Sequence, residues 1–122
     1  MKQALHQIYL RHRKGVMLSV LSAVLYFVGF CGFELFYLAW ICLVPVLWAV
    51  DDPAVSQRAA FGYGWVFGTV TVLGGYTWLA DMLRTFGGLS FPLSMLALTL
   101  FALAHGLLWA VWLWLVHYLS VI

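Results

Sequence analysis

A short polar stretch between two apolar segments holds the residues whose types and spacing could do chemistry. Asp81 and Arg84 are three residues apart, and Phe86-Gly87-Gly88 follows almost directly. A carboxylate and a guanidinium at this spacing share one face of a helix and can pair with each other. The guanidinium could instead bind a phosphate, such as that of a lipid headgroup. The sequence leaves both interpretations open.

His105 and the two cysteines are the other side chains with chemical potential. An ionisable group near the middle of a membrane helix is a candidate functional residue. No carboxylate is expected at the depth of His105, which favours the alternative, a neutral imidazole hydrogen-bonded to a neighbouring helix. Cys31 and Cys42 lie in apolar sequence, where burial disfavours the reactive thiolate. No compact set of metal ligands or phosphate-binding glycine loop is present, so we expect no metal and no cofactor.

The composition is that of a membrane protein. Apolar residues make up 66% of the 122-residue chain and charged residues only 8%, against roughly 25% charged residues in soluble domains. This excludes a water-soluble fold. We also expect no nucleic-acid partner.

Charged residues divide the chain into uncharged runs of 19, 16, 22 and 38 residues. Because runs of this length do not alternate in polarity, they favour helices over barrel strands. We therefore predict an all-α membrane protein of about four transmembrane helices in one domain. Their expected ranges are about 16–33, 35–50, 59–80 and 91–117.

The second helix is the shortest of the four. Sixteen residues reach only about 24 Å, and Pro45 removes an internal hydrogen bond, so this segment is expected to be bent, tilted or partly re-entrant. The third helix should start with Asp52 as its cap and Pro53 in its first turn. Ser90 and Pro92 provide a similar start for the fourth.

Glycine spacing in the third predicted helix indicates close helix packing. Gly64 and Gly68 form a GxxxG pair, which lets another backbone approach. A ligand role for these glycines is the alternative. Trp65 and Trp109 lie deep in their segments and are expected to pack against neighbouring helices.

Basic residues set the expected orientation. Four of them precede the first helix and Arg58 lies two crossings later, whereas Arg84 alone is on the other side. Five against one places both termini and the 51–58 connection in the cytoplasm. The 81–90 connection, expected as a loop, and the boundary residue Glu34 then face outward.

The order of motifs resembles the amino-terminal membrane region of bacterial apolipoprotein N-acyltransferases. The resemblance rests on GFCGFELFYLAWICLVPVLWAV, then AFGYGWVFGTVTVLGGYTWL, then LRTFGG before a long apolar helix. The resemblance covers essentially the whole chain. It rests on the order and spacing of the motifs together and not on any one of them. One departure is Cys31-Gly32, where many members have a Ser-Pro-like turn.

The resemblance implies a multi-pass protein of the bacterial plasma membrane. Its family moves an acyl chain from a phospholipid to the amino-terminal cysteine of a lipoprotein, and both substrates become expected partners. The family's chemistry resides in a nitrilase-like domain with a Glu-Lys-Cys triad, which has no counterpart here because no lysine follows Lys14. We therefore expect no catalytic residue in this chain, which should be inactive alone and require that catalytic domain as a partner. It would be the front portion of a longer enzyme or a relative lacking the catalytic half.

The resemblance also suggests which residues face the substrates. They belong to the predicted outer connection and its flank: Trp78, Asp81, Arg84, Phe86, Gly87 and Gly88.

Two functions from other classes remain as alternatives. A small four-helix transporter would ordinarily need a carboxylate at mid-membrane, and none is expected there. A structural or accessory membrane subunit would use packing glycines and aromatic belts equally well.

Overall fold

The computed structural model describes residues 1–30 and 36–122, and all regular structure within these ranges is helical. Cys31, Gly32 and Glu34 lie outside the described residues. The described residues form six helices: α1 (Lys2–Phe30), α2 (Leu38–Ile41), α3 (Val44–Val50), α4 (Gln57–Gly75), α5 (Thr77–Gly87) and α6 (Phe91–Val121). The all-α prediction is confirmed.

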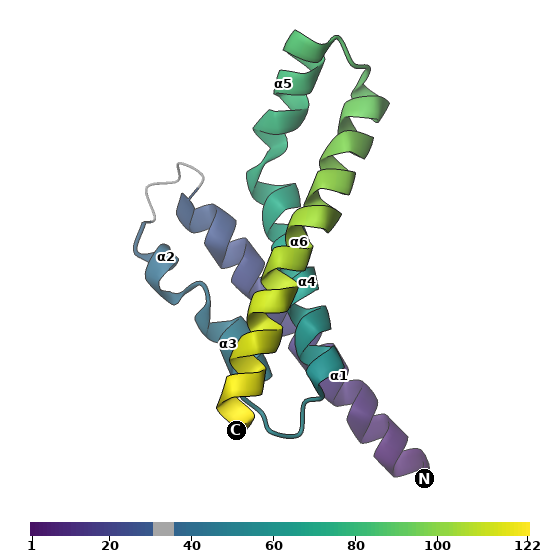
Figure 1. The fold of residues 1–122 in the computed structure, drawn as a ribbon, viewed down its shortest axis with the longest axis vertical. Helices are drawn as coiled ribbons and strands as arrows, with labels where there is room; N and C mark the ends of the chain where they lie inside the picture. The colour runs from purple at the N-terminus through teal and green to yellow at the C-terminus, as the bar shows by residue number, and fades with distance from the viewer. Residues whose placement is uncertain (31–35) are drawn as a thin grey trace.

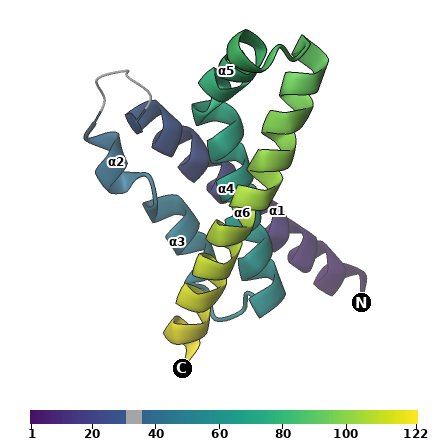
Figure 2. The ribbon, with the colours of Figure 1, turned by 45° about the horizontal axis from the view of Figure 1, so that its top comes forward.

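The helices follow an up-and-down path. In Figure 1, α1 rises from the amino terminus, α2 and α3 descend, α4 and α5 rise, and α6 descends to the carboxyl terminus. Both termini and the α3–α4 connection therefore lie toward one end, as Figure 2 also shows. We call this end, with residues 1–14 and 51–58, the basic end. The α5–α6 turn lies at the opposite end.

Among the described residues, two helices are long and apolar enough to cross a membrane, α1 and α6. Helix α1 begins at Lys2 rather than near residue 16, because the basic segment continues the helix without a break. Helix α6 has Ser90 at its cap position and Pro92 in its first turn, as expected, although the Ser90 side chain makes no capping hydrogen bond. The helix extends to Val121 rather than residue 117.

The predicted helix at 35–50 is wrong as a continuous element, because its described part divides into α2 and α3. Pro45 occupies the first turn of α3, where its missing N–H leaves no gap in the hydrogen-bond ladder. The backbone N–H of Val46 donates instead to Ser22 Oγ on α1, at 2.8 Å. A neighbouring helix thus satisfies a donor that the helix start leaves free.

The predicted helix at 59–80 is also wrong in its bounds. Helix α4 starts after Ser56, whose side chain accepts a hydrogen bond from Ala59 N–H, so Ser56 and not Asp52 is the cap. The helix stops at Gly75. Tyr76 then leaves helical geometry, with φ −113° and ψ 25°, and α5 begins.

Helices α4 and α6 pack at backbone contact. A Cβ atom built on Gly64 would lie 2.5 Å from the carbonyl oxygen of Trp109, and one on Gly68 would lie 2.8 Å from Gly106 Cα. Beside this contact, Phe67 meets the Trp109 ring edge-on, with centroids 4.9 Å apart. The packing role predicted for the GxxxG pair is confirmed, and so is the packing of Trp109 against α4.

Candidate functional site

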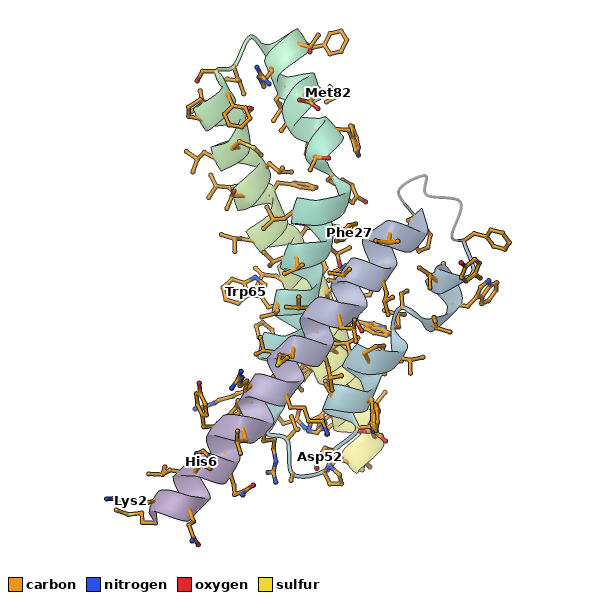
Figure 3. All side chains as sticks on the ribbon, turned by 180° about the vertical axis from the view of Figure 1, so that it is seen from behind. Lys2, His6, Phe27, Asp52, Trp65 and Met82 are labelled. Carbon is orange, nitrogen blue, oxygen red and sulfur yellow. The ribbon has the colours of Figure 1, made fainter. Side chains whose placement is uncertain are left out.

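Most of the predicted outer residues lie on α5, which is an amphipathic helix. The expected 81–90 loop is wrong in its first part, because the chain stays helical to Gly87. Ala80 is buried in a cluster with Leu98 of α6, and half-buried Leu79 packs against the same cluster. Most other side chains of α5 are exposed, Trp78 at 56% and Phe86 at 87%. Figure 3 shows Met82 of α5 at the end of the molecule opposite Lys2.

Arg84 links α5 to the start of α6. Its Nη1 atom lies 4.0 Å from Asp81 Oδ1, so the predicted pair forms at the distance limit of an ion pair. The Asp81 side chain is largely exposed and that of Arg84 about half exposed. On its other side the guanidinium lies over the Phe91 ring, 5.3 Å from the centroid. The sequence did not single out Phe91, because the position of Phe91 beside Arg84 depends on the turn between the helices. An exposed pair of this kind stabilises by less than about 1 kcal/mol, so the guanidinium can exchange Asp81 for a phosphate.

The turn after α5 depends on Gly88. Its φ of 63° places it in the left-handed region, and its N–H donates to the carbonyl of Leu83 to cap the helix. Gly87 is different, because a Cβ there would meet only the Leu89 side chain at an ordinary 3.8 Å. Of the two predicted glycines, the structure requires only Gly88.

Trp78 belongs to an aromatic cluster at the α4–α5 break. Its ring lies 6.0 Å from Tyr76, and Tyr76 in turn lies 6.3 Å from Phe101 and 6.5 Å from His105. His105 stacks on Phe101 at 5.7 Å, with the ring planes 22° apart. The structure thus places His105 among aromatic rings, whereas the sequence favoured a hydrogen bond across helices. The sequence did not single out Phe101, which lies one helical turn before His105.

A second histidine has a role that the sequence did not reveal. His117 is almost fully buried, and its Nδ1 lies 2.6 Å from the carbonyl oxygen of Val50. It therefore ties α6 to the end of α3. Its neighbours in sequence gave no sign of this, because the contact joins residues 67 positions apart.

The arrangement on α5 can bind and orient but does not contain the groups for acyl transfer. It offers one cation, one carboxylate and exposed aromatic rings. Cys42, the free cysteine among the described residues, is buried and lies far along the chain, where its thiol donates to the Ala39 carbonyl. Within residues 1–30 and 36–122, no group of three potential metal ligands comes together.

Comparison with known proteins identifies the family. The family model described as apolipoprotein N-acyltransferase N-terminal domain matches residues 22–122. The chain belongs to this family. The search of curated proteins and that of solved structures each found no match. The match takes in all of α2 to α6 and residues 22–30 of α1, so the apolipoprotein N-acyltransferase N-terminal domain and the bundle largely coincide.

Proposed function

We propose that this chain is the membrane-embedded, substrate-positioning part of an apolipoprotein N-acyltransferase in the bacterial plasma membrane. The observation that carries the proposal is the family match over residues 22–122. The apolar surfaces of α1 and α6 support a membrane location. The same match disfavours a transporter or an unrelated accessory subunit.

We further propose four crossings with the basic end in the cytoplasm. The up-and-down path supports this, because its four legs, α1, α2–α3, α4–α5 and α6, bring the start of α1 and the α3–α4 connection to the same end while α5 lies at the other (Figure 1). Basic residues are enriched on the cytoplasmic side of membrane proteins.

Helix length supports an outer position for α5. Helix α6 has 31 residues, and residues 57–87, which contain α4 and α5, are equal in number. Each of these two segments is therefore roughly 46 Å long. A hydrocarbon core is about 30 Å thick, which leaves about 16 Å outside it or taken up by tilt. With the basic end at the cytoplasmic boundary, α5 and the first turns of α6 reach the level of the outer headgroups.

In this position each predicted residue has a physical role. Arg84 binds the phosphate of the donor phospholipid, which displaces Asp81. Trp78 and Phe86 lie along its acyl chains, and the Gly87-Gly88 turn keeps the approach open for the lipoprotein amino terminus. The thioester chemistry belongs to a nitrilase-like catalytic domain that acts above this surface, because positioning alone supplies no nucleophile.

Reconstitution tests the proposal. The purified chain in phospholipid vesicles, given a diacylated lipopeptide, is expected to yield no N-acylated product by mass spectrometry. Co-expression with the catalytic domain of a family member is expected to yield product, and Arg84→Gln should slow its formation about tenfold, the effect of losing one charged hydrogen bond.

Two results would contradict the proposal. One is product from the isolated chain that disappears with Cys42→Ser, because this would reveal a nucleophile within the bundle. The other is an unchanged rate with Arg84→Gln, which would leave α5 a connector. Arg13→Gln, a charge removed at the basic end, serves as the matched control.

A further inference from the structure

A cavity opens at the basic end, far from α5. Its volume is about 260 Å³, and it lies where α1 meets α3 and the α3–α4 connection. Four charged side chains line it: Arg11, Lys14, Asp51 and Asp52. Figure 3 shows Asp52 on the connection that runs beside α1. Equal numbers of cations and carboxylates thus face one space.

Arg11 and Asp52 hold the α3–α4 connection against α1. Arg11 Nε lies 3.9 Å from Asp52 Oδ2, and Arg11 Nη1 donates to the Ala54 carbonyl at 3.3 Å. Asp52 Oδ1 also accepts from Ala54 N–H at 2.9 Å. These contacts use both groups within the protein.

The second pair is not engaged in this way. Lys14 Nζ lies 5.7 Å from the centre of the Trp48 ring, a cation–π contact that leaves its three N–H donors available. Within the part of the chain that the structure describes, neither Lys14 nor Asp51 makes an ion pair. Both face the same cavity without reaching each other. A ligand that carries an anion and a cation a few ångströms apart would satisfy both.

An apolar groove continues from this cavity. It has a volume of about 380 Å³, shares Trp48 and Asp51 with the charged cavity, and lies between α3 and the end of α6. Val44, Leu47 and Val116 line it. A polar cavity beside an apolar groove, with a tryptophan between them, is complementary to a lipid at a membrane interface, which has a polar headgroup and apolar chains.

We infer that this end of the bundle binds a phospholipid whose headgroup carries a phosphate and a primary ammonium. Lys14 binds the phosphate, Asp51 accepts hydrogen bonds from the ammonium, and one acyl chain follows the α3–α6 groove. The lipid joins α1 to α3 as a structural ligand. This site is independent of the acyl-donor position proposed at α5, because the two lie at opposite ends of the molecule.

Native mass spectrometry of the full chain tests the inference. The purified protein is titrated separately with dioleoyl phosphatidylethanolamine, phosphatidylcholine and phosphatidylglycerol. We expect phosphatidylethanolamine to bind about tenfold more tightly than the others, because phosphatidylcholine has no N–H to donate and phosphatidylglycerol has no cation for Asp51.

Two variants separate the charges. Lys14→Gln should weaken all three lipids, whereas Asp51→Asn should weaken phosphatidylethanolamine alone and so remove its advantage over phosphatidylglycerol. Arg13→Gln, a neighbouring exposed cation that does not line the cavity, should change nothing. Unaltered helical content by circular dichroism verifies that the variants fold.

Three outcomes would overturn the inference. The first is equal binding of phosphatidylethanolamine and phosphatidylglycerol to the unaltered chain. The second is a preference that survives Asp51→Asn. The third is displacement of the lipid by equimolar free phosphoethanolamine, which would show that the site reads a soluble headgroup without its acyl chains.

Discussion

At the turn between α5 and α6, one glycine holds a backbone conformation that other residues resist. Gly88 has φ 63°, whereas Gly87 is helical and a Cβ there would make only an ordinary contact with the Leu89 side chain. The two neighbours therefore form a natural pair for testing whether conformation or lack of a side chain matters at this turn.

We predict that Gly88→Val destabilises the chain by about 1–2 kcal/mol, the cost of a left-handed conformation for a residue with a side chain. Gly87→Ala should change stability by less than about 0.5 kcal/mol. Gly88→Asn should fall between them, because asparagine tolerates this conformation better. Thermal unfolding in detergent measures all three, and an unaffected Gly88→Val would show that the turn is not fixed.

Some of the site was predictable at the residue scale. The Asp81–Arg84 pair follows from spacing along one helix, and it forms. The contacts of Arg84 with Phe91 and of His117 with Val50 were not predictable, because each depends on how distant helices meet.

At the scale of elements, uncharged runs predicted that helices form but not where they break. Apolar sequence continues from Ala59 to Ala80, so hydropathy gave no sign of the break at Tyr76. Gly74 and Gly75 precede the break, and adjacent glycines weaken a helix. Pro45 was recognised as a disturbance, but the sequence did not show that it begins a new helix, α3, whose Val46 N–H donates to Ser22 of α1.

The α4–α6 contact gives a second prediction with a matched control. Gly64→Ala and Gly68→Ala each introduce a Cβ within 2.8 Å of α6 atoms, and should destabilise the bundle by about 1–3 kcal/mol. Gly62 lies on the same helix, and a Cβ there would meet nothing within 4 Å. Gly62→Ala should thus be neutral or stabilise by up to about 1 kcal/mol. Equal effects at the three positions, measured by thermal unfolding, would contradict close packing of α4 on α6.

At the scale of the whole molecule, charge and topology agree. Both termini and the α3–α4 connection share the basic end, while α5 projects from the other (Figures 1 and 2). The two proposed roles follow from this arrangement. The basic end lies on the cytoplasmic side and binds lipid, and α5 lies on the outer side and positions the substrates. Both roles require that the membrane separate the two ends.

Cysteine accessibility in intact cells measures that separation directly. Ala54 on the α3–α4 connection and Thr85 on α5 are both exposed, which makes them suitable positions for a reactive thiol. In a chain with Cys31 and Cys42 replaced by serine, we predict that a membrane-impermeant maleimide labels Thr85→Cys from outside and labels Ala54→Cys only after the membrane is opened. Labelling of Ala54→Cys but not Thr85→Cys in intact cells would contradict the proposed orientation, because α5 would then face the cytoplasm, away from the lipoprotein substrate.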